Sequence, residues 1–434
     1  MRPFLTRFRI PAVIAAFSTA GVLACSSDKG ITDPPPTNRF SASCPSLNFG
    51  PAPTEITVAP HAPVTMQTLG GGTVTERYTA EVAVRGNTAY TTSWGTRFAA
   101  GNAIYVWDVA GDTPVLVDTV LVDGGVSTIG DVAVSPDGQL LVVGTERTPG
   151  WVVIYDLADP RHPKLLSRFT SAETLNGVHT AEIGTVNGKL YAFLAVDLLG
   201  SSPSRVTILD LSTPGTPRLA YSRVAGTPFA HDSFQRSGLL FVGLWTDGTE
   251  IWDIGGCGTG ATPEAPRVIG NVKNVNGRTH NIWWYHDAAG SKSFAFVGEE
   301  GPASIGSTST GDIHVIDLSE PSAPKEVAFY HVDGAGTHNF SVDETNGILY
   351  AAYYNGGVRA LDIRGDLGKC PASQQVGTGG GVVRCDLKLM GREMGVGLLD
   401  RGKPVYVWGV QYVNGIVYAS DMLNGIWKLR ALAR

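Results

Sequence analysis

The chain has 434 residues, of which 43% are hydrophobic and only 17% are charged, and it contains 54 glycines and 26 prolines. Low charge with many turn-forming residues is typical of short buried strands rather than long solvated helices. The formal net charge of -6 argues against a nucleic-acid-binding protein, for which a basic surface is expected.

The first 24 residues have the pattern of a bacterial lipoprotein signal peptide. Arg2, Arg7 and Arg9 precede a short apolar run that ends in Val22-Leu23-Ala24-Cys25. This run is too short for a membrane-spanning helix, which needs about 20 residues. We expect cleavage before Cys25 and attachment of a lipid to this residue, with an ordinary secretory signal as the alternative.

Residues 25–43 are expected to form the lipidated cysteine and a flexible tether. They include Asp33-Pro34-Pro35-Pro36-Thr37 and show no apolar periodicity. Ser26, and not an acidic residue, follows Cys25. By resemblance to Gram-negative lipoproteins, this favours an outer-membrane location, facing either the periplasm or the outside.

Four more cysteines follow, an even number that suggests disulfides in an exported chain, and four cysteines allow three pairings. Cys370 and Cys385 bound a glycine-rich stretch within an insertion at residues 364–385. Their pairing would close a loop of about 15 residues. Cys44 would then pair with Cys257, and free buried thiols are the alternative.

One pattern recurs along the rest of the chain: an apolar strand ending in aspartate, a short turn with proline, and another apolar strand. The clearest copy is His314-Val315-Ile316-Asp317-Leu318, and further copies end at Asp108, Asp156, Asp210, Asp253 and Asp362. Their spacing of roughly 40 to 60 residues is typical of propeller blades with four strands each. We expect each aspartate to form a turn by accepting hydrogen bonds from nearby backbone.

Two more strands joined by a tight turn lie between successive copies. Val186-Asn187-Gly188-Lys189 is an example, and Asn-Gly is a strong hairpin signal because both residues tolerate positive φ. The first of these two strands is expected to be the innermost one of its blade. Counting them predicts an all-β, seven-bladed β-propeller over residues 44–434, with innermost strands near Tyr78, Asp131, His179, His231, His280, His338 and Trp408.

The last blade lacks an outer strand, because only residues 430–434 follow its third strand at residues 425–429. An extended segment ahead of Tyr78 is expected to supply the missing strand. The two candidates are residues 55–58 and residues 64–67. Such an N-terminal strand would close the ring and remove exposed sheet edges.

Residues 153–163 and 313–324 carry the repeat with both of its prolines. On these residues the chain resembles the LVIVD-repeat propellers of bacterial exported proteins. The resemblance extends from about Tyr78 to the C-terminus. It implies the propeller fold and export, but no particular activity, because this family has no single established one.

Aligning the hairpins places a histidine at the start of the innermost strand in four adjacent blades: His179, His231, His280 and His338. Innermost strands line the central channel of a propeller, so these imidazoles can converge on one Fe, Cu, Zn or Mn ion. The alternative is a structural role, in which each histidine hydrogen-bonds within its own blade. The other five histidines are expected in turns or at the surface: His61, His162, His286, His314 and His331.

Four histidines in a seven-bladed propeller are similar in outline to the iron centre of carotenoid-cleaving oxygenases. Here they occupy consecutive blades, which should displace a metal ion from the propeller axis. No other oxygenase motif is present in the sequence.

Acidic and aromatic residues are expected near the histidines, because the loops after the second strands reach the same end of the channel. Such residues beside histidines make a candidate binding site. Glu299 and Glu300 are candidates to orient a histidine. The full set is Tyr78, Trp94, Glu146, Asp197, Trp245, Asp247, Glu299, Glu300, Trp408 and Asp421.

Other catalytic motifs are absent, including the Gly-x-Ser-x-Gly elbow, the P-loop and the His-Glu-x-x-His helix. The sequence therefore predicts a monomeric cell-envelope lipoprotein that binds an envelope protein, a glycan or a small molecule. A metal-dependent oxidoreductase with a four-histidine centre is the alternative. The only cofactor candidate is one transition metal ion.

Overall fold

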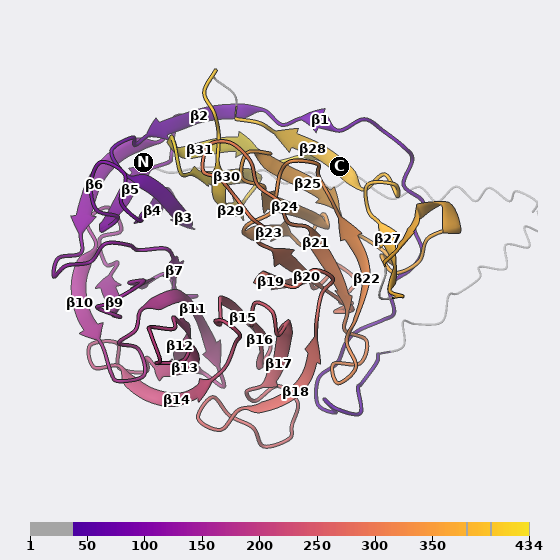
Figure 1. Ribbon diagram of the computed structural model, residues 1–434, viewed down its shortest axis with the longest axis horizontal. Coiled ribbons are helices and arrows are strands. Elements are labelled where there is room, and N and C mark those ends of the chain that lie inside the picture. Colours follow the sequence, from indigo (N-terminus) through magenta and orange to yellow (C-terminus); the bar gives the residue numbers. More distant parts are fainter. Residues whose placement is uncertain (1–37, 379–380, 400–401, 434) are drawn as a thin grey trace, which may run out of the picture. The chain divides into compact units, whose positions relative to one another are not determined.

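The computed structural model describes residues 38–378, 381–399 and 402–433. Its strands form seven sheets arranged around one central axis, and one end strand of each sheet is innermost (Figure 1). This confirms the predicted all-β, seven-bladed propeller. The one helical element among the described residues is the short 3-10 helix η1 (Ala372–Gln374).

Blades 1 to 4 are antiparallel sheets of four strands that follow chain order from the channel outward. Blade 1 consists of β3 (Tyr78–Arg85), β4 (Thr88–Trp94), β5 (Ala103–Asp108) and β6 (Val115–Leu121). Blade 2 consists of β7 (Val132–Val134), β8 (Leu140–Gly144), β9 (Val152–Asp156) and β10 (Lys164–Phe169). Blade 3 consists of β11 (Val178–Val186), β12 (Lys189–Val196), β13 (Arg205–Asp210) and β14 (Arg218–Val224). Blade 4 consists of β15 (Asp232–Arg236), β16 (Leu239–Gly243), β17 (Thr249–Asp253) and β18 (Arg267–Val272).

Blades 5 to 7 take up additional segments. Blade 5 consists of β19 (Thr279–Trp284), β20 (Phe294–Glu299), β21 (Ile313–Asp317) and β22 (Lys325–Tyr330), extended by β27 (Val383–Asp386) and β26 (Gln375–Gly377) from the insertion. Blade 6 consists of β23 (Phe340–Asp343), β24 (Ile348–Ala352), β25 (Val358–Asp362) and β28 (Glu393–Gly397), with β1 (Val64–Thr65) added parallel to β28. Blade 7 consists of β29 (Val407–Val413), β30 (Ile416–Asp421), β31 (Gly425–Arg430) and β2 (Thr68–Thr73).

An N-terminal strand closes the ring as predicted, but both candidate segments were wrong. The closing strand is β2, which pairs antiparallel with β31, whereas residues 55–58 form no strand and β1 joins blade 6. β2 contains three consecutive glycines because it runs against the backbone of Asp112 and Thr113 at Gly70 and against buried indole rings at Gly71 and Gly72. A Cβ atom on Gly72 would lie 2.3 Å from Cζ3 of Trp107, so a side chain does not fit there.

The aspartates that end the third strands form turns, as the repeat predicted. Asp156 Oδ1 accepts a hydrogen bond from Ala158 N at 2.7 Å, and Asp317 Oδ1 accepts one from Ser319 N at 2.8 Å. The same bond to the residue two positions later occurs at Asp108, Asp210, Asp253 and Asp362. These side chains therefore stabilise the turn that follows the third strand.

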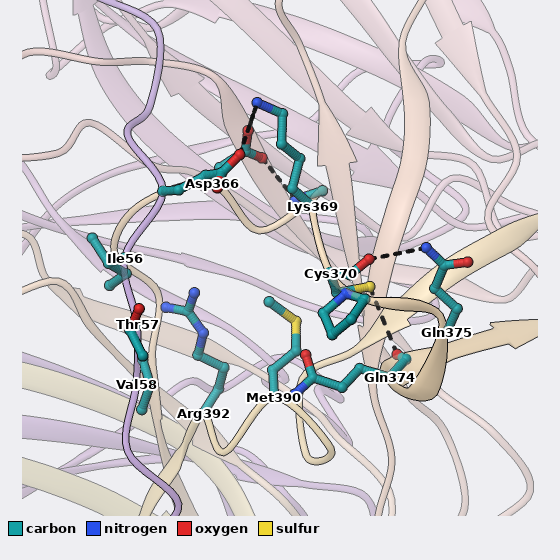
Figure 2. A pocket seen from close by; sticks show the side chains of 13 residues that line it. Ile56, Thr57, Val58, Asp366, Lys369, Cys370, Gln374, Gln375, Met390 and Arg392 are labelled. Carbon is teal, nitrogen blue, oxygen red and sulfur yellow. Dashed lines mark hydrogen bonds and ion pairs between the residues drawn. The ribbon is translucent and has the colours of Figure 1, made fainter.

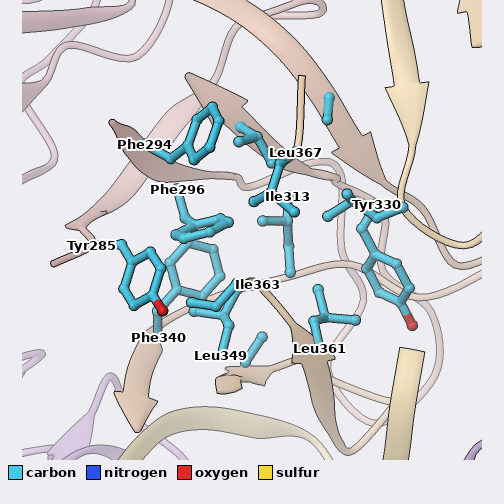
Figure 3. Close-up of a cluster of buried hydrophobic side chains, with 14 of the residues drawn as sticks. Tyr285, Phe294, Phe296, Ile313, Tyr330, Phe340, Leu349, Leu361, Ile363 and Leu367 are labelled. Atoms are coloured by element: carbon cyan, nitrogen blue, oxygen red, sulfur yellow. The ribbon is translucent and has the colours of Figure 1, made fainter. Parts of the chain in front are cut away.

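Seven hydrophobic clusters hold the ring together, one at each interface between neighbouring blades. Figure 3 shows the cluster between blades 5 and 6, where Phe296 and Ile313 of blade 5 face Leu349 and Leu361 of blade 6. Burying one such side chain contributes roughly 1.5–3 kcal/mol. The blades are therefore fixed relative to one another, and so are the side chains that they project into the channel.

Both predicted disulfides are present. Cys44–Cys257 joins the N-terminal segment to blade 4, and Cys370–Cys385 bounds a loop of the insertion. The tether ends earlier than residue 43, because Ser41 and Ser43 already donate hydrogen bonds to Glu320 of blade 5. The signal peptide, Cys25 and the tether up to residue 37 lie outside the described residues. Within the described part, no helix has the length and apolar character needed to cross a membrane.

Candidate functional site

The four predicted histidines lie side by side in an arc at one end of the channel, which we call the histidine end. Ring centroids are 4.3 Å apart between His179 and His231, 4.0 Å between His231 and His280, and 4.0 Å between His280 and His338. The arc continues to Trp408 of blade 7, whose ring is 4.2 Å from that of His338. The repeat thus stacks one ring per blade, because each ring lies at the start of its innermost strand or one or two residues ahead of it.

His179 is the charged member of this arc. Its Nδ1 lies 3.1 Å from Asp197 Oδ1, and its Nε2 lies 3.1 Å from the Nε2 of His231. Burial alone would lower its pKa, but the carboxylates of Glu146 and Asp197 outweigh burial and raise the pKa of His179 to about 10. An imidazolium at His179 can donate to both Asp197 and His231.

The next three histidines are buried and neutral. Burial and the positive charge of His179 lower the pKa of His280 to about 3, and burial holds the pKa of His231 and of His338 well below the usual range. His338 Nδ1 lies 2.7 Å from the carbonyl oxygen of Trp408. In contrast, both ring nitrogens of His280 and Nδ1 of His231 are buried without a hydrogen-bond partner among the described residues. Unpaired buried nitrogens are costly and call for a ligand or an ion.

Glu300, from the loop after β20, completes this group. Its Oε2 lies 3.6 Å from His231 Nε2 and 3.9 Å from His280 Nε2. Among the described residues, these are the only three metal-binding side chains whose donor atoms all lie within 4.8 Å of one another. Tyr354 donates a hydrogen bond of 2.5 Å to the other oxygen, Oε1, and so orients the carboxylate.

A small void of about 30 Å³ borders all four histidines, together with Glu146 and Trp408. This volume equals that of about one water molecule in the liquid. It is large enough for a single ion with little solvent.

Aromatic side chains surround the histidines, as the loop prediction proposed. Trp245 stacks on His231 at 5.4 Å, and Phe229, which the sequence did not single out, packs on Trp245 at 4.7 Å. Trp94 lies 5.6 Å from Trp408, and its indole nitrogen donates to Glu146 at 3.2 Å. Tyr78 packs against the same cluster. These rings enclose the histidine end in apolar surface.

Three of the predicted site residues do not reach the histidine arc. Glu299 Oε2 lies 3.4 Å from His314 Nε2, outside the arc. Asp421 is fully buried, and its oxygens accept from Tyr406 N, Leu423 N, Asn424 Nδ2 and Trp427 Nε1, which makes it structural. Asp247 lies in the turn after β16, where its amide donates to Leu244 O, and no polar contact among the described residues links it to a histidine.

The assignment of His314 to a turn or the surface is wrong. His314 lies in β21 with none of its side chain exposed, and its Nδ1 is 2.8 Å from Glu326 Oε1. Arg384 of the insertion pairs with the same carboxylate. His314 is therefore part of a buried ionic group within blade 5.

Four carboxylates that the sequence did not single out as site residues form a second layer, which we call the acidic belt: Glu81, Asp131, Glu182 and Asp232, one from each of blades 1 to 4. Burial, with the neighbouring charge of Asp131, raises the pKa of Glu81 and of Glu182 to about 8. The sequence does contain a feature that could have revealed the acidic belt. In four successive blades, an acidic residue follows the aligned histidine, or the residue equivalent to it, within three positions.

A cavity of about 600 Å³ lies at the outer edge of the ring, where residues 55–58 face the insertion (Figure 2). Its buried Arg392 donates to the carbonyl oxygen of Arg364 at 2.7 Å and lies 3.8 Å from Asp362. Lys369 at its edge pairs with Asp366 and Glu55. Its charges are thus compensated internally, so we place the candidate site at the histidine end.

No protein-family model matches the chain, and no curated protein matches it. The function therefore has to be inferred from the geometry of the chain's own side chains.

Proposed function

We propose that this protein is a metal-binding β-propeller of the bacterial cell envelope, in which His231, His280 and Glu300 hold one divalent transition metal ion. The observation that carries this proposal is the convergence of two neutral imidazoles and one carboxylate, with donor atoms within 4.8 Å of one another. His179 is a fourth candidate ligand, because its Nε2 lies 3.1 Å from that of His231. Binding there would have to release the proton that this nitrogen carries in the imidazolium.

The chemistry of the donors supports a transition metal ion rather than calcium or magnesium. Imidazole nitrogens favour Zn, Cu, Fe and related ions, whereas Ca²⁺ and Mg²⁺ take oxygen ligands. A bound ion would also give a partner to Nε2 of His280, which has no hydrogen-bond partner among the described residues and lies 3.9 Å from Glu300. Tyr354 would orient the Glu300 carboxylate, and the surrounding aromatic rings would limit the access of water.

We expect the purified mature protein to contain one transition metal ion per chain after growth in metal-replete medium, measured by elemental analysis. His280→Ala should weaken metal binding by at least about 100-fold, because losing one ligand costs several kcal/mol. His162→Ala is the matched control, since His162 lies in an exposed turn of blade 2 and should leave metal content unchanged. Competition with a chelator, using Zn²⁺, Fe²⁺, Cu²⁺ and Mn²⁺ in turn, measures the effect.

Thermal melts separate a metal centre from a purely structural histidine arc. A metal ligand stabilises the folded state only when the metal is present, by RT ln(1 + [L]/Kd). The His280→Ala variant should therefore lose stability relative to the wild type mainly in metal-treated samples. Equal losses with and without metal would show that the histidines serve packing and hydrogen bonding instead.

An oxidoreductase built on the same centre is the second candidate function. It is favoured by Tyr354, whose hydroxyl donates to Glu300 and whose ring lies 5.0 Å from that of His338. Such a role requires a redox-active ion. A purified protein that holds only zinc, which has no redox chemistry, would leave the binding scaffold as the function.

The second part of the proposal, attachment to the envelope through a lipid, is supported by the lipobox and by the resemblance to exported LVIVD-repeat proteins. Cys25→Ser should prevent lipidation, so that unprocessed precursor accumulates or the protein leaves the membrane fraction. Ser26→Asp is the control, because it should keep the lipid but shift the protein to the inner membrane. A Cys25→Ser protein that still fractionates with the outer membrane without detergent would contradict lipid anchoring.

A further inference from the structure

The channel contains a second cavity next to the histidines, which we call the vestibule. It has a volume of about 450 Å³ and is lined by the inner strands on the side of the hairpin turns. This volume lies within the roughly 300–1,000 Å³ range of small-ligand pockets. Asp131, Asp232 and Asn339 border both the vestibule and the small void at the histidines.

The vestibule is lined by several carboxylates but by no positively charged side chain. All four carboxylates of the acidic belt line it, and no lysine or arginine is found among its lining residues. Within the part of the chain that the structure describes, the belt accepts hydrogen bonds from neutral donors: Asn339 Nδ2 donates to Glu81, and the amide of Ala181 donates to Asp131 at 2.7 Å. Placing several carboxylates together away from bulk water is unfavourable unless protons or a cation neutralise them.

The vestibule also contains polar side-chain oxygens without a hydrogen-bond partner among the described residues. Ser233 lines the vestibule, is 5% exposed, and its Oγ has no hydrogen-bond partner among the described residues. Asn339 lines it too, and its Oδ1 is likewise without a partner. Both oxygens can accept hydrogen bonds from N–H donors of a ligand.

The arrangement does not suit a bare metal ion. The four carboxylates come from four successive blades and are spread along an arc of the channel. They do not form a group of donor atoms within 4.8 Å of one another among the described residues. A ligand that meets them all must be larger and must carry its positive charge at separated points.

Aromatic residues that line the vestibule can pack against the alkyl chain of a ligand. Phe234 and Trp283 lie with ring centroids 5.2 Å apart, and Tyr412 lines the same cavity. Aromatic rings bind alkyl chains and attract ammonium groups through their faces. Asn281 of blade 5 and Gln411 of blade 7 add amide groups to the lining.

We infer that the vestibule binds a small aliphatic amine with at least two ammonium groups, held by Glu81, Asp131, Glu182 and Asp232. The ammonium groups meet the separated carboxylates and the free oxygens of Ser233 and Asn339, while the methylene chain packs on the aromatic rings. This inference goes beyond the proposed metal centre and does not depend on it.

Calorimetry with spermidine tests the inference, using the full mature protein in detergent with EDTA at low ionic strength. We expect saturable binding of spermidine and none of 1,6-hexanediol, which has the chain but no charge. Glu182→Gln should weaken binding by about tenfold or more. Asp112→Asn, which removes an exposed carboxylate from a turn of blade 1, should change it by less than about twofold.

Three results would overturn the inference. One is no saturable heat with spermidine, and another is equal weakening by Glu182→Gln and Asp112→Asn, which would show only nonspecific attraction. The third is equally tight binding of Mg²⁺, measured after the EDTA has been removed by dialysis, which would assign the belt to hydrated inorganic cations. A melting curve of Glu182→Gln checks its folding, and the diol comparison on the wild type stands even if that variant fails to fold. Because EDTA removes transition metal ions, a failure of the metal centre leaves these outcomes unchanged.

Discussion

Removing the disulfide between Cys44 and Cys257 is expected to lower the free energy of unfolding by about 5 kcal/mol, because it closes a very long loop. The two cysteines are 213 positions apart, and both side chains are fully buried. The bond also fixes the N-terminal segment on blade 4, and this segment leads to β2, which closes blade 7 on the far side of blades 5 and 6. Loss of the bond therefore removes a covalent constraint on the segment that leads into the closing strand β2.

The second disulfide provides the matched comparison. Cys370 and Cys385 are 15 positions apart, so the chain-entropy model gives only about 3 kcal/mol for their bond. Denaturant unfolding of Cys44→Ala/Cys257→Ala and of Cys370→Ala/Cys385→Ala measures both values. A loss from the short loop that equals or exceeds the loss from the long one would contradict the loop-length argument.

The number of blades and the histidine arc could be predicted from sequence because both depend on local spacing. A hairpin fixes the distance from the start of the innermost strand to the second strand, so His179 and His338 align through Tyr191 and Tyr350. Each copy of the repeat then adds one blade with the same register. The turns at Asp156 and its equivalents could be predicted for the same reason, because each aspartate accepts a hydrogen bond from an amide only two positions later.

The acidic belt is harder to recognise because irregular pairing shifts the register between blades. Glu81 and Glu182 stand three residues after Tyr78 and His179, whereas Asp232 directly follows His231. The pairing of β3 with β4 and of β11 with β12 contains a register shift near the start, and the pairing of β15 with β16 shows none. A strict period of two therefore misses that these carboxylates line one cavity.

Loop residues and ring closure escaped prediction for other physical reasons. Glu299 ends β20 and Glu300 follows it, so the two consecutive side chains point to different partners, His314 and His231. Sequence alone does not show which of the two faces the channel. The closing strand could not be predicted because β2 has the composition of a loop. Its glycines are explained only by the backbone and the indole rings that pack closely against it in the folded chain.

Glu81→Gln is expected to make the protein more stable relative to the wild type as the pH rises from about 6.5 to about 8.5. Burial and Asp131 raise the pKa of Glu81 from 4.5 to about 8, so the folded chain retains a proton that the unfolded chain releases. Stability contributed by this proton is fully present below about pH 4.5 and is lost as the pH rises through 8. One pKa unit corresponds to about 1.4 kcal/mol, so the variant should gain about 1–2 kcal/mol over this window.

The window avoids the opposite effect of the buried histidines. The pKa of His280 is lowered to about 3, so its contribution to stability is lost as the pH falls below about 6.5, where the unfolded chain takes up protons. His179, with a raised pKa, affects wild type and variant alike and cancels in their difference.

Glutamine keeps an oxygen that accepts from Asn339, so the variant removes mainly the charge. Glu55→Gln, at a side chain that is 74% exposed, should give a profile parallel to the wild type. A Glu81→Gln profile that also runs parallel would mean that Glu81 is already ionised in the folded protein, so that a belt of fixed negative charge exists at neutral pH.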